Sequence, residues 1–229
     1  MFGINDKNRR LIMVASLLVI SGALFFIVHN VNQQSATNEI GSNMQTIVGE
    51  TCARELIRLM GEEGRIAVLT LDTSEQKIVP ATCALNGFLN AIKKHPHLKV
   101  VTTEKLAADP LTMMNSSSFG IPVETFHHIV TSDPELDAIV SFVGAPKLTA
   151  GQMSQMIAGQ RRPKVIVVSS LGYCGPWVKP LLKAGFIQAA IMPNPTPVNI
   201  MDSRQRTARE WYEMLFAVVT AETADKLPE

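Results

Sequence analysis

The chain has 229 residues, of which 46% are hydrophobic, and its charges nearly cancel at a net +1. This length is enough for one domain with accessory segments. A near-neutral charge without a long basic cluster or an acidic tail argues against a nucleic-acid-binding protein.

A long apolar segment near the N-terminus predicts a membrane anchor. Lys7, Arg9 and Arg10 precede Leu11–Val28, which contains no charged residue. A helix of this length rises about 27 Å, close to the ~30 Å hydrocarbon core of a bilayer. Cleavable signal peptides usually have a shorter apolar region that ends in a small-x-small site, and no Ala-x-Ala follows here. We therefore expect an uncleaved anchor, with cleavage after about Ala36 as the alternative.

The basic flank also predicts the orientation. The positive-inside rule places residues 1–10 in the cytoplasm and the rest of the chain outside. The expected localisation is the bacterial inner membrane, with a single span and the domain on the periplasmic or extracellular side. Residues 29–43, rich in Asn, Gln, Ser and Thr, are expected to form a polar linker, and residues 44–229 the domain.

Apolar segments alternate with segments of helical periodicity throughout this domain. The expected strands are Arg65–Asp72, Leu98–Thr103, Ala138–Phe142, Lys164–Ser170 and Phe186–Met192. The expected helices are Ile47–Met60, Val79–Lys94, Val123–Ser132, Leu148–Gly159, Trp177–Ala184 and Met201–Thr223. Strands that are almost wholly apolar and separated by helices predict an α/β fold with a single doubly wound, mostly parallel sheet of about five strands.

Several motifs follow one another in a fixed order between residues 41 and 195. They are Gly49 with Ala53, Arg54 and Leu56, then Gly64–Leu69, Gly87-Phe88 with Ala91-Ile92, Val100-Val101, Asp109, Asp133–Val140, Val165–Val168 and Gly185–Ile191. In this order they resemble the C-terminal lobe of the type I periplasmic binding proteins, the ribose-binding and LacI-like sugar-binding family. The resemblance implies a periplasmic-binding-protein-like lobe that takes part in solute binding.

The positions that read the sugar in that family carry other residues here. Ala84 stands where an arginine is usual, Val143-Gly144 replace Asn-Asp, Ser169–Leu171 replace Gly-Phe-Asp, and Pro193 replaces a polar residue. The family also has an N-terminal lobe that encloses the sugar, whereas here the expected anchor precedes the domain. Each lost hydrogen bond costs about 0.5–1.5 kcal/mol. We therefore expect common pentoses and hexoses to bind with millimolar dissociation constants or not measurably.

Ligands of open α/β sheets bind at the carboxyl ends of the strands. The side chains that we expect to contact a ligand there are Asp72, Ser74, Ser170, Tyr173, Trp177 and Asn194. The aromatic rings of Tyr173 and Trp177 suit stacking on a sugar. For Trp177, packing against its own loop is the favoured alternative. For Asp72, a helix cap or a loop hydrogen bond is an equal alternative.

The sequence offers no pattern for a metal, a cofactor or catalysis. Adjacent residues on a helix point in different directions, so His127 and His128 do not predict a metal site. No nucleophile elbow and no phosphate loop is found. We expect no cofactor and no enzyme activity.

Two further groups of residues have open alternatives. Cys52, Cys83 and Cys174 are expected to be free thiols, with a Cys52–Cys83 disulfide as the alternative. Arg161-Arg162 with Lys164 predict a solvated turn before a strand, and a patch for a headgroup or a protein partner is the alternative.

The leading functional hypothesis is a membrane-anchored extracytoplasmic solute-binding-like protein, related to the substrate-binding proteins of sugar ABC transporters, that binds or senses a carbohydrate. The alternative is a degenerate lobe that acts as a structural or protein-interaction module of the cell envelope, with a protein replacing the missing lobe. An enzyme ranks last. The expected partners are a sugar-like small molecule, the inner membrane and a protein, but no nucleic acid.

Overall fold

The computed structural model of the protein describes residues 38–72, 79–107, 120–146, 148–149, 151–152, 162–169, 175–194 and 206–227. The expected anchor Leu11–Val28 lies outside these ranges, and so does most of the expected helix Leu148–Gly159. Within them, no helix is both long and apolar enough to cross a membrane. The chain divides into residues 1–41 and a compact unit, Ser42–Glu229, which contains the sheet.

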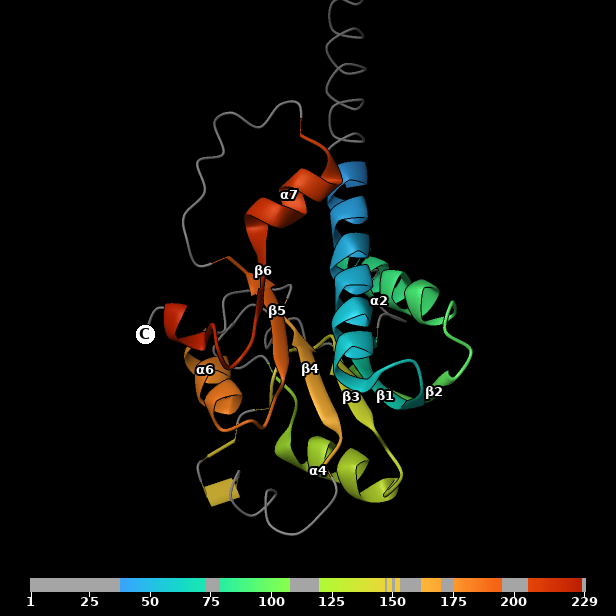
Figure 1. Ribbon diagram of the computed structural model, residues 1–229, viewed down its shortest axis with the longest axis vertical. Coiled ribbons are helices and arrows are strands. Elements are labelled where there is room, and N and C mark those ends of the chain that lie inside the picture. The colour runs from blue at the N-terminus through green and yellow to red at the C-terminus, as the bar shows by residue number, and fades with distance from the viewer. Residues whose placement is uncertain are drawn as a thin grey trace, which may run out of the picture. The chain divides into compact units, whose positions relative to one another are not determined.

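A single mixed sheet forms the centre of this unit. Its strands in the described residues are β1 (Gly64–Asp72), β2 (Leu98–Ala107), β3 (Ala138–Ser141), β4 (Lys164–Val168), β5 (Ala189–Pro193) and β6 (Phe216–Val219). They lie in the order β2-β1-β3-β4-β5-β6 (Figure 1). β1 to β5 pair in parallel, and β6 pairs antiparallel with β5. The predicted α/β class with a mostly parallel sheet is confirmed.

Helices cover both faces of the sheet, as a doubly wound fold requires. They are the helix over residues 38–60 (helix 38–60), α2 (Val79–Ile92), α4 (Val123–Ser132), α6 (Gly175–Lys183) and α7 (Ala208–Leu215), followed by the short 3-10 helix η3 (Ala224–Lys226). Helix 38–60, α2 and α7 contribute to the apolar cluster on one face. α4, α6 and η3 contribute to the cluster on the other. β1, β3, β4 and β5 are buried almost throughout, which explains their apolar sequences.

Two glycines allow helix 38–60 to pack closely against α2, beside which it lies (Figure 1). A Cβ atom on Gly49 would lie 1.9 Å from the carbonyl oxygen of Ala84, and one on Gly87 would lie 2.2 Å from the carbonyl oxygen of Thr46. Any side chain at either position would overlap the backbone of the other helix. Both glycines belong to the motifs that carry the family resemblance, so the structure gives these motifs a packing role.

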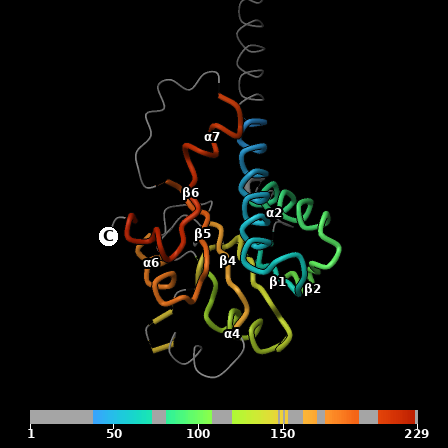
Figure 2. The backbone as a smooth tube through the Cα atoms, viewed as in Figure 1, coloured from blue at the N-terminus to red at the C-terminus, as the bar shows by residue number. Residues whose placement is uncertain are grey.

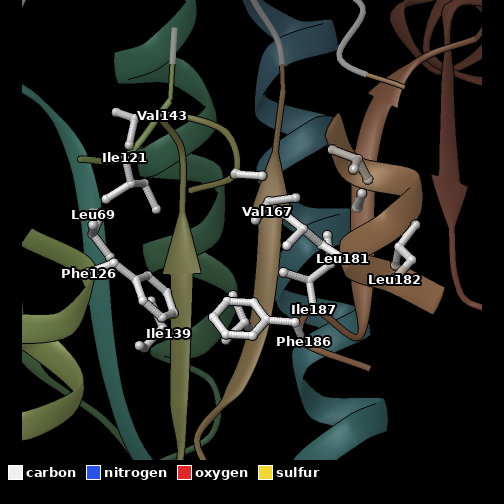
Figure 3. Close-up of a cluster of buried hydrophobic side chains, with 14 of the residues drawn as sticks. Leu69, Ile121, Phe126, Ile139, Val143, Val167, Leu181, Leu182, Phe186 and Ile187 are labelled. Atoms are coloured by element: carbon white, nitrogen blue, oxygen red, sulfur yellow. The ribbon is translucent and has the colours of Figure 1, made fainter. Parts of the chain in front are cut away.

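Aromatic and aliphatic side chains fill the opposite face (Figure 3). Phe126 of α4 and Phe186 after α6 point toward one another, with ring centroids 5.4 Å apart. Ile139 and Val167 of the central strands belong to the same buried cluster. Each fully buried side chain of this size contributes roughly 1.5–3 kcal/mol, so this cluster fixes α4 and α6 on the sheet.

The C-terminal segment corrects the expected helix Met201–Thr223. Helix α7 ends at Leu215, and Phe216 is extended, with φ −125° and ψ 149°. Residues 216–219 then return beside β5 as the sixth strand (Figure 2), whereas we expected about five. The segment reads Phe-Ala-Val-Val, which suits a strand, and the outer edge of β5 supplies the hydrogen-bond partners. Residues 201–205 lie outside the described ranges.

Other differences concern boundaries. Residues 38–43, which we assigned to the linker, are helical, so the helix begins before Ile47. β2 continues to Ala107 because its pairing with β1 extends to Asp72. β5 begins at Ala189 rather than Phe186, because Phe186 is buried in the turn that follows α6.

Candidate ligand site at the carboxyl edge of the sheet

Polar residues stand where three parallel strands end. Asp72 is the last residue of β1, Ser169 follows β4 and Asn194 follows β5, and each is half-buried. Because these strands are parallel, the three residues share one edge of the sheet, the carboxyl edge. Neighbouring strands lie about 4.8 Å apart, so Asp72 and Ser169, separated by β3, lie roughly 10 Å apart along this edge. Asn194 lies one strand farther.

The turn after β3 closes the middle of the carboxyl edge. The Ser141 hydroxyl donates a hydrogen bond to the carbonyl oxygen of Gly144 (2.6 Å) and accepts one from the N–H of Val143 (3.2 Å). Gly144 has φ +85°, a left-handed conformation that favours glycine. Val143 is only 2% exposed and joins the core of Figure 3. At the positions where the type I periplasmic binding proteins have Asn-Asp, this chain therefore has a buried apolar turn.

Asn194 connects the end of β5 to the end of α7. Its backbone N–H donates to the carbonyl oxygen of Leu215 (2.7 Å), and its Nδ2 donates to the carbonyl oxygen of Met214 (3.3 Å). The amide therefore has a structural role in the fold. Its position at the carboxyl edge agrees with the sequence prediction, and its contact with a ligand stays a prediction.

Trp177 lies in the first turn of α6, which follows β4 along the chain. Its side chain is 50% exposed, unlike its helix neighbours Val178, Leu181 and Leu182, which are buried. An exposed indole offers a flat apolar surface on which a sugar ring can stack. Asp72 ends β1 and Trp177 lies in the first turn of α6, and contact of either side chain with a ligand stays a prediction. Ser74, Ser170 and Tyr173 lie outside the described residues.

The other residues that the sequence singled out have structural roles or stay untested. His127 and His128 are both exposed on α4, and no group of three metal-ligating side chains occurs among the described residues. Cys52 is a buried free thiol, as expected, and Cys83 is a free thiol that is only half-buried. Cys174 lies outside the described ranges. Burial, and secondarily the charge of Glu55, raise the pKa of the Cys52 thiol.

Sequence reasoning missed two polar residues near this edge. Ser141 holds the turn after β3, and the signal was a lone hydroxyl at the end of an apolar strand. Gln45 on helix 38–60 is only 7% exposed, and its Oε1 has no hydrogen-bond partner among the described residues. Helix 38–60 ends beside the start of β1, so its first turns lie toward the carboxyl edge. A buried acceptor without a partner is costly and is therefore a candidate contact for a ligand.

No protein-family model and no curated protein sequence matches the chain significantly. Solved structures do match. The arabinose-binding protein of Geobacillus stearothermophilus aligns with a TM-score of 0.53 and 17% identity, over 81% of this chain and 63% of that one. A sugar-binding protein of a Bacillus halodurans ABC transporter aligns with a TM-score of 0.51 and 14% identity, over 80% of this chain and 64% of that one. The fructose-binding periplasmic domain of a hybrid two-component system aligns with a TM-score of 0.51 and 18% identity, over 80% of this chain and 58% of that one.

The chain shares its fold with part of these sugar-binding proteins. This confirms the predicted resemblance at the level of the fold, and the assignment to the C-terminal lobe stays a prediction. The chain spans less than two thirds of the length of these three proteins. The first two of these structures are an arabinose-binding protein and a sugar-binding protein of an ABC transporter.

Proposed function

We propose that the protein is an extracytoplasmic solute-binding protein that contacts a carbohydrate at the carboxyl edge of its sheet. The observation that supports this most strongly is the fold, which it shares over about four fifths of its length with arabinose-, sugar- and fructose-binding proteins. Ligands of open α/β sheets bind at this edge. Asp72 ends β1 and Asn194 follows β5 at this edge. The exposed Trp177 lies in the first turn of α6, the helix that follows β4 along the chain.

The same edge argues for weak binding. Sugar recognition requires several well-placed donors and acceptors in a largely dry site. The turn after β3 presents Val143 and Ala145, both buried, in place of polar groups. Three or four missing hydrogen bonds, at about 0.5–1.5 kcal/mol each, weaken binding by orders of magnitude. The proposal is therefore a millimolar carbohydrate contact.

Calorimetric titration of the full-length protein with a panel of pentoses and hexoses tests the proposal. We expect a millimolar dissociation constant for at least one sugar. Trp177→Ala and Asp72→Ala should each weaken it, because they remove the stacking surface and a hydrogen-bonding carboxylate. Lys99→Gln, at the start of β2 and far from this edge, should not.

Two outcomes of this titration would overturn the proposal. Absence of measurable binding to every sugar would leave the second hypothesis, a protein-interaction module. Micromolar binding that Trp177→Ala or Asp72→Ala abolishes would show a site far stronger than the buried turn after β3 allows.

The proposal includes a membrane anchor. Its support is the sequence alone, the basic residues Lys7, Arg9 and Arg10 before the uncharged Leu11–Val28. Protease added to cells with an opened outer envelope should then digest the domain. Recovery of a mature protein that begins near residues 35–37 would instead show a cleaved signal peptide.

A further inference from the structure

A cavity lies at the opposite edge of the sheet, where the strands begin. This cleft, the amino-edge cleft, has a volume of about 720 Å³. The charged residues that line it include Arg65, Lys99, Arg162 and Lys164, with Glu63 and Asp137. Four cationic side chains thus face two carboxylates in a chain whose total charge is nearly neutral.

The first residues of three strands place three of these cations at one edge of the sheet. Arg65 and Lys99 are direct partners of β1 and β2, so their backbones lie about 4.8 Å apart and their side chains point to the same face. Lys164 starts β4, two strands from β1, and pairs with Ala138 of β3, which is the partner of Ile66. Its side chain therefore leaves the opposite face of the sheet from Arg65 and lines the cleft across the ends of the strands. Lys99 and Lys164 are both exposed.

Hydrogen bonds to two aspartates hold Arg65 in place. Its guanidinium donates to Oδ2 of Asp133 at the end of α4 (2.8 Å), and its backbone N–H donates to Oδ2 of Asp137 (2.9 Å). The second oxygen of Asp133 accepts the N–H of Glu135 (3.1 Å). Among the described residues, the buried Nε of Arg65 has no acceptor, although the side chain as a whole is 42% exposed. The guanidinium of Arg65 is thus fixed by Asp133 and is partly open to the cleft, while its Nε is buried.

We propose that the amino-edge cleft binds a small phosphate-bearing anion, with Lys99 and Lys164 as charge partners and the fixed, half-exposed guanidinium of Arg65 beside them. Lysine binds phosphate as a point charge, and the planar guanidinium of arginine donates in a fixed geometry. The volume falls within the range of small-ligand sites, about 300–1,000 Å³. The anion could come from a soluble phosphorylated compound or from a lipid headgroup, which share this chemistry. The proposal is independent of the sugar contact, because the two sites lie at opposite edges.

Titration of the full-length protein in neutral detergent with inorganic pyrophosphate tests the cleft. Saturable binding is expected, and Lys99→Gln and Lys164→Gln should each weaken it by about tenfold, since a hydrogen bond to a charged group contributes at least that factor. The matched control is Lys105→Gln, which removes the same charge from an exposed position on the same strand. It lies six residues farther along, about 20 Å away, and should leave the affinity unchanged.

Phosphatidylglycerol added to the micelles identifies the source of the phosphate. Competition with pyrophosphate that depends on Lys99 and Lys164 supports a lipid headgroup, and unchanged pyrophosphate binding supports a soluble compound. Absence of saturable pyrophosphate binding in the wild-type protein would overturn the proposal. Equal weakening by Lys105→Gln would also overturn it, because it would show general charge attraction without a site.

Discussion

Single atoms decide the packing of helix 38–60 on α2. Gly49→Ala places a Cβ atom 1.9 Å from the Ala84 carbonyl oxygen, so the helices must move apart. We expect a loss of about 3 kcal/mol in the free energy of unfolding, at the upper end of overpacking costs. Urea denaturation followed by circular dichroism measures this loss.

The control for this prediction is Gly41→Ala in the same helix. A Cβ atom there meets nothing within 4 Å, and alanine favours a helix over glycine by up to about 1 kcal/mol. We therefore expect unchanged or slightly raised stability for Gly41→Ala. Equal midpoints for the two variants would show that the close helix contact is not present in solution.

The buried thiol of Cys52 predicts sensitivity to alkaline pH. Its folded-state pKa is raised by burial, while an unfolded cysteine titrates near about pH 8.5. The contribution of this thiol to the free energy of unfolding is therefore fully present below that pH. It is lost as the pH rises toward the folded-state pKa, by up to about 1.4 kcal/mol per pH unit. Between pH 8 and 10, the urea midpoint of Cys52→Ala should fall less than that of the wild type.

Cys83→Ala is the matched control for this titration, because Cys83 is only half-buried. It should keep the wild-type slope. Tyr212, whose pKa burial also raises, is present in all three proteins and therefore cancels in the comparison. Identical slopes for Cys52→Ala and the wild type would contradict the burial of the thiol.

For single residues, the sequence predicted where polar side chains lie in the sheet better than which contacts they make. Asp72 and Asn194 stand at the carboxyl edge because strand periodicity and parallel topology locate strand ends. The sequence could not show that Asn194 bonds to Met214 or that Ser141 closes its turn, since both depend on contacts formed only in the folded chain.

At the level of the elements, α7 begins with a complete hydrogen-bonded cap. The Thr207 hydroxyl accepts the N–H of Glu210 (3.3 Å), and the Glu210 carboxylate accepts the N–H of Thr207 (2.7 Å), which is a capping box. Thr207→Ala removes the first bond and should lower the free energy of unfolding by about 1 kcal/mol. Glu213→Ala, an exposed position on the same helix, should change it much less. Equal effects in thermal denaturation would contradict the cap.

The sequence located the parallel strands and α4 well but missed β6. A buried parallel strand has its own signal, a short β-branched run between helical segments. β6 depends instead on an edge of β5 that exists only after the sheet has assembled, and its four residues are too few for a clear pattern. The helical periodicity upstream therefore predicts a helix that continues through these four residues.

At the scale of the whole molecule, Asn43–Glu229 should fold without the preceding segment. Ser42–Glu229 is a compact unit with apolar clusters on both faces of its sheet. A domain of this size typically buries about 70% of its unfolded surface. We expect a cooperative thermal transition in calorimetry for the purified fragment. A broad, non-cooperative change would mean that another segment or a partner completes the fold.

The two edges of the sheet make different demands on a ligand. The carboxyl edge has half-buried polar residues around an apolar turn, and the amino edge has an open cationic cleft. A neutral sugar and a phosphate-bearing anion should therefore perturb different ends of the same strands. β2 provides a reporter for each, with Lys99 at one end and Ala107, the partner of Asp72, at the other.

The most direct test of a sugar contact is nuclear magnetic resonance of 15N-labelled Asn43–Glu229 during titration with arabinose, fructose and related sugars. We expect shifts in fast exchange with millimolar dissociation constants, largest for the backbone signals of Asp72, Ser169 and Asn194 and for the indole N–H of Trp177. The signals of Lys99 and Lys164 should stay in place. Shifts confined to the amino edge, or no shifts for any sugar, would contradict the assignment of the carboxyl edge as a carbohydrate site.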